Sequence, residues 1–215
     1  MLVLPTSYLG PISYYAALYH SGEVVIEAHE HYVKQTLRNR TMIATGQGEL
    51  MLTAYVEKGG KMRMPVSSMR LSDHNDWPRQ HLYALATYYG MSPFYEYYID
   101  DLREVLLDGH DGTLLGMNEA LRRRICQEIG FEPHVRLSTE WMGPVPEQNL
   151  TGWHDRVTRY LAEHPYYQIG AVQGQRSFMA DMSIVDLLFN MGPESIGVLD
   201  AIAAKQMPSG CPVNC

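Results

Sequence analysis

The order of apolar and polar positions near the start of the chain predicts a strand–helix–strand unit. Strand-like runs that are mostly apolar lie at 1–4 and 23–28, and a helical pattern between them follows Pro11 and ends at Ser21-Gly22. Proline suits the first turn of a helix, and glycine is common just after its end. Two strands joined by one short helix are parallel, so we expect a βαβ unit here.

The rest of the chain alternates short apolar runs with helical stripes of apolar residues. These patterns predict a hairpin of strands 40–45 and 49–56, an edge strand at 62–66, helices at 78–89, 94–107 and 113–129, a strand at 134–137, and helices at 151–162, 183–189 and 194–205. Glycine, proline and polar residues in 139–151 predict a long mobile loop.

These elements predict an α/β fold, with a mixed α+β arrangement as the alternative. It has an N-terminal βαβ unit, a short hairpin and several packed helices. We predict a single domain over residues 1–215, with a flexible tail at 207–215.

Composition excludes several classes of protein. The net charge of −7 gives no basic face for phosphate backbones, so we expect no nucleic-acid partner. No stretch approaches the ~18 apolar residues of a membrane span, so we expect no membrane insertion. The start of the chain lacks the basic segment of a signal peptide and reaches Pro5 early, which indicates a cytoplasmic protein.

The three cysteines do not form a disulfide framework in a chain of this size. Cys126 lies in an amphipathic helical pattern, and we expect it to be buried. Cys211 and Cys215 either bind a soft metal or lie in a frayed tail, and two thiolates alone favour the second reading.

The densest group of titratable side chains lies in residues 27–40, directly after the second predicted strand. Open α/β sheets bind ligands at the ends of such strands. The group contains Glu27, His29, Glu30, His31, Lys34, Arg38 and Arg40. A surplus of charge in one short segment of a chain with 19% charged residues indicates a candidate binding site.

The cations of this segment suit an anionic ligand. Lys34, Arg38 and Arg40 have the reach to clamp a phosphate or carboxylate, and Asn39 offers both a donor and an acceptor. The alternative is a solvated basic face or ion pairs with the nearby glutamates. We predict substrate binding by Lys34, Arg38, Asn39 and Arg40.

His29 and His31 would lie on one face of a strand, a spacing that metals use. The alternative, solvated histidines at a polar strand end, is favoured because no further ligand motif is present. We therefore predict no metal site, and the sequence specifies no cofactor.

An aromatic group supplies further candidates. Trp77 and His81, one turn apart on a predicted helix, suit a sugar or a base, and Tyr8 lies in the first strand-to-helix loop. The alternative is a buried tryptophan beside a hydrogen-bonded histidine. The chain has no phosphate-binding glycine motif and no legible Ser/His/Asp triad.

Tyrosine pairs and acidic residues late in the chain have ordinary interpretations. We interpret Tyr88-Tyr89 and Tyr97-Tyr98 as core and interface residues. Four further acids are interpreted as surface charges and caps: Asp181, Asp186, Glu194 and Asp200.

Several separated segments resemble, in order, the WbqC-like family, whose members are encoded among bacterial surface-polysaccharide (O-antigen type) biosynthesis genes. The resemblance covers roughly residues 2–140. It rests on residues 4–11, Lys34 with Asn39-Arg40, residues 50–56, Trp77 with His81, and residues 92–98. Where many members have adjacent aspartates after the second strand, this chain has Glu27 and Glu30.

The resemblance implies an enzyme of surface-glycan biosynthesis that acts on a nucleotide-linked or amino sugar, with small-group transfer as the expected reaction. His81 or Glu30 would move the proton as catalytic residues, and Tyr8 and Trp77 would join the substrate-binding set. The alternative is a non-catalytic assembly protein that uses tyrosine-rich helices as its contact surface. A homodimer is one such assembly.

Overall fold

The structure, a computed structural model, describes residues 1–57, 64–143, 146–174 and 177–204. A three-stranded parallel sheet has the order β1-β2-β5, formed by Leu2–Pro5, Val24–Glu27 and Val135–Leu137. Helix α1 (Ile12–His20) connects β1 to β2, and Leu2 pairs with Val24 in parallel register. The predicted βαβ unit is confirmed.

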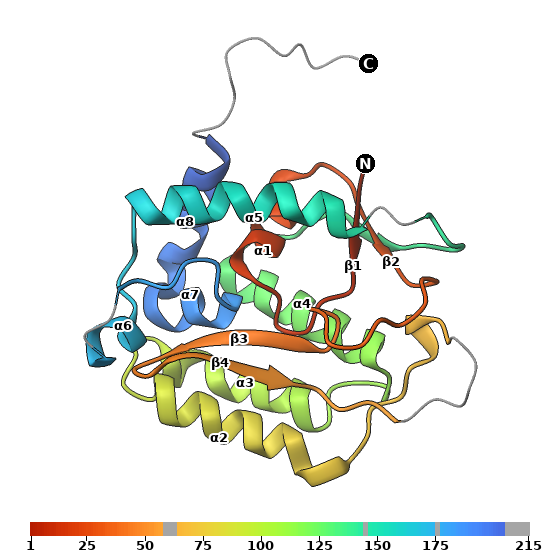
Figure 1. Ribbon diagram of the computed structural model, residues 1–215, viewed down its shortest axis with the longest axis horizontal. Coiled ribbons are helices and arrows are strands. Elements are labelled where there is room, and N and C mark those ends of the chain that lie inside the picture. Colours follow the sequence, from red (N-terminus) through yellow and green to blue (C-terminus); the bar gives the residue numbers. More distant parts are fainter. Residues whose placement is uncertain (58–63, 144–145, 175–176, 205–215) are drawn as a thin grey trace.

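A β-hairpin forms a second sheet. Strands β3 (Arg40–Thr45) and β4 (Gly48–Thr53) pair antiparallel, with Met42 opposite Met51. The turn falls at Gly46-Gln47, and Gly48 has a φ of 125°, a conformation that glycine adopts without strain. In Figure 1 the hairpin crosses the middle of the molecule, between α2 and α3 on one side and α1 and α7 on the other.

Helices cover both sheets. Their bounds are Trp77–Tyr89 (α2), Tyr95–Leu107 (α3), Leu114–Ile129 (α4), Pro146–Glu163 (α5), Ile169–Gly174 (α6), Ile184–Met191 (α7) and Ser195–Ala204 (α8). Short 3-10 helices occur at Val66–Ser68, His74–Asp76 and Gly192–Glu194. The predicted fold class is confirmed in its mixed α+β form.

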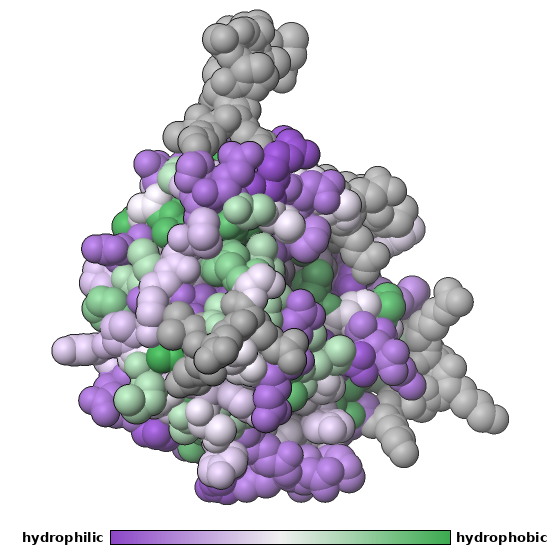
Figure 2. Space-filling model, turned by 60° about the vertical axis from the view of Figure 1, so that its left-hand side comes forward, coloured by the Kyte–Doolittle hydropathy of each residue, from purple (hydrophilic) through white to green (hydrophobic). Residues whose placement is uncertain are grey.

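Helix α5 lies along the top of the molecule in Figure 1 and packs on α1 and β1. The side chains of Leu150, Trp153, Val157 and Leu161 are buried and recur every three or four residues along one face, while most other positions of 151–163 are exposed. Figure 2 shows polar residues gathered along this upper edge. Residues 146–151 begin this helix, so the loop predicted there is wrong. Pro146 at the first position starts a helix rather than breaking one.

The predicted edge strand at 62–66 is also wrong in its described part. Residues 62–63 lie outside the described residues. Pro65 makes only an isolated bridge with His31, and Val66 begins a 3-10 helix. Lys205 and the tail with Cys211 and Cys215 lie outside the described residues as well.

Buried apolar side chains from both sheets and from the helices form one contiguous core. Cys126 lies in it, as predicted. Asp186 lies in it too, so its interpretation as a surface charge is wrong. Its carboxylate accepts hydrogen bonds from the Tyr89 hydroxyl at 2.8 Å, the Tyr166 hydroxyl and the Gln168 amide at 2.8 Å. Burial raises the pKa of Asp186, while these donors offset part of the cost.

Candidate functional site

The loop between β2 and β3, residues 28–39, lies at the carboxyl edge of the parallel sheet. It is tied to the end of β1, since the Tyr8 amide donates to the Leu37 carbonyl at 2.9 Å. At the end of β2, Glu27 is fully buried. It accepts hydrogen bonds from the Ser138 hydroxyl at 2.8 Å and the Met142 amide at 2.7 Å. Glu27 therefore joins the loops that follow β2 and β5.

Arg38 and Glu30 form a buried ion pair in the same loop. The Arg38 Nε donates to Glu30 at 2.7 Å, and Nη2 donates to the other carboxylate oxygen at 2.5 Å. The Arg38 side chain is 2% exposed and that of Glu30 is 11% exposed. This two-pronged geometry satisfies the charge of each side chain. The ion-pair alternative considered for the segment therefore describes Arg38.

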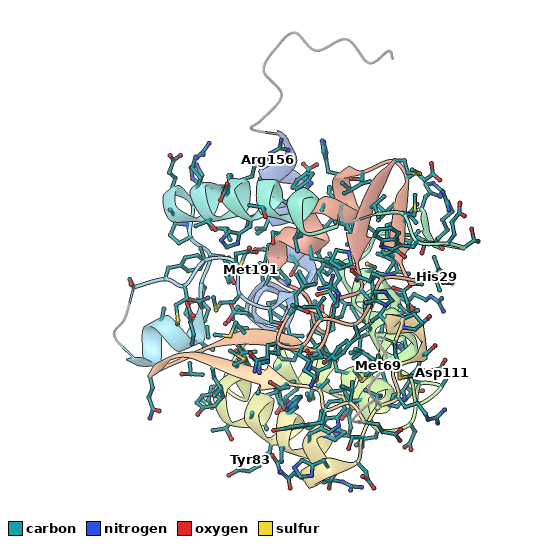
Figure 3. All side chains as sticks on the ribbon, turned by 45° about the vertical axis from the view of Figure 1, so that its right-hand side comes forward. His29, Met69, Tyr83, Asp111, Arg156 and Met191 are labelled. Carbon is teal, nitrogen blue, oxygen red and sulfur yellow. The ribbon has the colours of Figure 1, made fainter. Side chains whose placement is uncertain are left out.

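Other predicted binding residues of the segment separate in space. Asn39 is buried, and its side-chain amide donates to the Ala54 carbonyl at 3.0 Å, which fixes the loop to the chain after β4. Lys34 is exposed in a turn. His29 and His31 are also exposed, and Figure 3 shows His29 at the outer rim of the molecule. Among the described residues no group of three or more potential metal-ligating side chains gathers.

Tyr8, Trp77 and His81 do come together, in the interior. The Tyr8 hydroxyl and His81 Nδ1 are joined by a hydrogen bond of 2.8 Å, and the three rings pack at centroid distances of 5.1 to 5.9 Å. The Trp77 indole donates to the Ser72 carbonyl at 2.8 Å. Burial lowers the pKa of His81 to about 4, so the imidazole is neutral at pH 7. This is the hydrogen-bonded core arrangement named above as the alternative.

Arg40 differs from Arg38 because it faces a cavity. It is the first residue of β3, and alternation along the strand places Arg40 and Met42 on one face, opposite Met51 of β4. The cavity measures about 260 Å³, and Pro11 and Asp181 also line it. The Nε of Arg40 is buried and has no hydrogen-bond partner within the described ranges of the chain.

A carboxylate and a histidine accompany Arg40. Asp181 lines the same cavity and is buried, and its Oδ2 lies 2.5 Å from Nδ1 of His154 on α5. Its Oδ1 accepts a hydrogen bond from the Ser13 amide in the first turn of α1 at 2.7 Å. Burial raises the pKa of Asp181, while the hydrogen bond from His154 opposes that rise. The same hydrogen bond raises the pKa of His154.

The backbone around Asp181 is held from several sides. Asp181 has a φ of 53°, a left-handed conformation that is unusual for a residue other than glycine. Next to it, the Ser183 amide donates to the Met42 carbonyl at 2.7 Å, and Ile12 donates to the Met182 carbonyl at 3.0 Å. Strained residues that their surroundings fix in this way often occur at functional sites.

Of the predicted site residues, only Arg40 lines this cavity. The interpretation of Asp181 as a surface charge or cap is wrong, because its side chain is buried, and His154 was not among the candidates. They lie 27 positions apart and share no motif. The sequence does contain a signal for Asp181, which is the one acid in the mostly apolar segment 178–185. A charge in such a segment indicates a buried side chain that needs a polar partner, here His154.

Two other cavities flank α4. The larger, about 560 Å³, is lined by Arg122, Cys126 and Phe131 among others. The second, about 400 Å³, includes His110 and Asp111. Arg122 is paired with Glu119 at 2.7 Å, and Arg123, which lines both cavities, is exposed to solvent. Among the described residues, neither cavity therefore has a buried, unpartnered guanidinium N–H like the Arg40 Nε.

Comparison with known proteins gives two matches. The model of the WbqC-like protein family matches residues 6–170. The chain is also 26% identical to an uncharacterized protein, Rv1507c, of Mycobacterium tuberculosis (strain ATCC 25618 / H37Rv), over 90% of this chain and 94% of the relative. No solved structure matches significantly. No helix within the described ranges is long and apolar enough to cross a membrane.

Proposed function

Because the chain belongs to the WbqC-like protein family, we propose that it is an enzyme of surface-glycan biosynthesis that binds a nucleotide-linked or amino sugar. The Arg40 cavity holds an anionic group of that substrate. Arg40 is the anchor, and the reaction is a small-group transfer. The sugar class rests on the resemblance to the family, and the position of the anion rests on the cavity.

The observation that carries the proposal is the unpartnered Nε of Arg40. A buried guanidinium N–H without an acceptor is costly, and an oxyanion in the cavity would satisfy it. Pro11, Leu37, Met42 and Met51 give the cavity apolar walls, as in many small-molecule sites. Its volume lies just below the usual ~300–1,000 Å³, so it fits one part of a larger substrate.

The roles of the other predicted residues follow from their contacts. Glu30 and Arg38 satisfy each other, and this pair supports the loop that precedes Arg40. Proton transfer by Glu30 or His81 stays a prediction, and each would first have to exchange its present partner for a substrate. Lys34 is exposed and free to reach a second phosphate, if the substrate extends out of the cavity.

The test is a binding experiment with Arg40→Ala. We would measure melting temperature and heats of binding with inorganic phosphate, UDP-N-acetylglucosamine and glucosamine. A ligand at 100 times its dissociation constant stabilises the folded state by about 2.7 kcal/mol, a rise of roughly 5 °C or more in melting temperature. We expect Arg40→Ala to lose this rise and to keep nearly the melting temperature of the unliganded wild type.

Arg79→Ala is the matched control, because Arg79 is exposed and forms an ion pair with Asp76 on the surface. This variant should bind as the wild type does. Unchanged binding by Arg40→Ala, or a large loss of stability with binding intact, would contradict the role of Arg40 as anchor.

A second candidate function, a non-catalytic assembly protein, is favoured by exposed apolar side chains on the α2–α3 pair. Tyr83 is 76% exposed, Tyr97 75% and Met91 78%. Figure 3 shows Tyr83 pointing away from the body of the molecule. A folded protein that binds none of the probes, but whose mass in solution falls from dimer to monomer on Tyr83→Ser and Tyr97→Ser, would favour this function.

A further inference from the structure

His154, the hydrogen-bond partner of the cavity-lining residue Asp181, is held in one orientation. Asp181 binds Nδ1 of His154 at 2.5 Å, and the Asp181 side chain is only 1% exposed. The His154 side chain is 58% exposed, and Nε2 makes no hydrogen bond within the described part of the chain. A carboxylate that accepts from one ring nitrogen fixes the tautomer and leaves the other nitrogen to exchange protons.

The carboxylate itself is fixed from a second side. The Ser13 amide donates to Asp181 Oδ1, so the two oxygens have different and definite partners. The Ser13 donor lies in the first turn of α1, where a negative charge is favoured by the helix dipole. Asp181 would thus hold its position when His154 gains or loses a proton.

We propose that His154 and Asp181 form the proton-transfer pair of the Arg40 cavity, an inference that rests on the proposed function. Arg40 binds the anion of the ligand, and Asp181 joins the cavity wall to the imidazole. Neutral His154 accepts a proton at Nε2 from a hydroxyl or amino group of the bound ligand. The O–H or N–H bond breaks, its electron pair stays on the ligand, and the positive charge on the ring is balanced by Asp181.

This arrangement specifies the class of ligand. The ligand carries a phosphate or carboxylate that binds Arg40. It also carries a hydroxyl or amino group that reaches His154 and loses a proton. A phosphorylated sugar or an amino sugar phosphate has both groups. A neutral sugar lacks the anion, and inorganic phosphate lacks the separate hydroxyl or amino group of a sugar.

Binding of an anion at Arg40 and protonation of His154 are therefore linked. An anion at Arg40 places negative charge near His154 and favours the imidazolium form, and by reciprocity the protonated protein binds the anion more tightly. The charge of Asp155, on the same helix, also raises the pKa of His154. Arg156 and His20 of α1 lie against the ring of the neighbouring Trp153. Burial raises the pKa of Tyr32, and the charge of Arg40 opposes that rise. None of these groups lines the Arg40 cavity, as Asp181 does.

The experiment is an NMR titration of the His154 imidazole in the full chain, with and without inorganic phosphate. In wild type we expect phosphate to raise the pKa of His154 by about half a pH unit or more, equivalent to roughly threefold tighter phosphate binding to the protonated form. Arg40→Ala should lose the effect of phosphate. Asp181→Asn should return the pKa of His154 toward 6.5 without phosphate, since an amide oxygen still accepts from Ser13.

Phosphate binding is followed in the same samples by melting temperature, with exposed histidines elsewhere as internal references. Phosphate that binds through Arg40 and leaves His154 unmoved overturns the proton-transfer pair and leaves the proposed function standing. A wild type that binds neither phosphate nor the sugar phosphates overturns both. His154 that titrates identically in Asp181→Asn and wild type shows that the pair does not form in solution, and also overturns the inference.

Discussion

At the scale of single residues, burial determines the protonation state of His81. Tyr8 and Trp77 enclose the ring, and burial lowers its pKa from 6.5 to about 4. Protonation would place a charge in an apolar cluster. The histidine is therefore suited to accept or donate one fixed hydrogen bond at neutral pH.

This burial predicts a pH dependence of stability. Between pH 6.5 and about 4 the unfolded chain binds a proton at residue 81 that the folded chain does not, so stability falls as the pH falls through this window. The full effect is about 3 kcal/mol. His81→Gln should flatten the difference in unfolding free energy between pH 7 and pH 5 relative to wild type, as measured by urea denaturation.

The Tyr8→Phe variant tests the hydrogen bond between Tyr8 and His81 separately from the titration of His81. It leaves His81 titratable but removes the hydroxyl, so it should lower stability by about 1–3 kcal/mol at pH 7 and keep the pH dependence. Tyr83→Phe, on an exposed side chain, is the control and should stay within ±0.5 kcal/mol of wild type. An equal pH dependence in His81→Gln and wild type would contradict the lowered pKa.

At the scale of elements, Asp186 connects parts of the chain that are far apart in sequence. Its hydrogen bonds join α7 to Tyr89 at the end of α2 and to the segment of Tyr166 and Gln168 before α6. The Tyr89 hydroxyl also accepts from the Ala44 amide of β3 at 3.0 Å. One carboxyl thereby fixes the relative positions of two helices, a strand and a loop.

Asp186→Ala should therefore be among the most destabilising substitutions in the protein. It leaves the donors of Tyr166 and Gln168 buried without their acceptor and opens a small cavity, with an expected loss of about 3 kcal/mol or more. Urea denaturation beside Asp200→Ala, a change on an exposed residue of α8, measures it. A loss below ~1 kcal/mol would mean that the network relaxes onto water or other partners.

Sequence patterns predicted elements well where local signals are strong. The helix beginning after Thr113 is one case: Thr113 accepts from the Gly116 amide, and Gly130 ends the helix with a φ of 94°. Local signals could not find the Asp181–His154 pair, because long-range packing alone brings α5 to that loop. For the same reason Arg38 and Arg40, two positions apart, could not be told apart: one turns to Glu30 and the other faces a cavity.

At the scale of the whole molecule, the core extends beyond the region that defines the family. The family model ends at residue 170, yet residues 184–190 of α7 are all buried, and Ile184 and Ser183 bond to the backbone of Gly10 and Met42. Asp181, which lines the proposed site, also lies beyond residue 170. The family region alone thus lacks part of its own core and site.

A chain of residues 1–170 should consequently fail to fold cooperatively. Removing α7 exposes the apolar surface it covers, and the loss exceeds the 5–15 kcal/mol by which whole proteins are stable. The measurement is a thermal melt followed by circular dichroism, with the full chain in parallel. A sharp, two-state melt of the shortened chain would show that α7 is an accessory element.

The strand order of the parallel sheet also has a kinetic consequence. β2 lies at the centre, but the hairpin and three long helices separate it in sequence from its partner β5. Contacts between such distant segments form slowly, because a long loop must close before they are made. Until then Val24, Val25 and Ile26 present an unpaired apolar strand edge to other chains. Aggregation during refolding should therefore begin at β2.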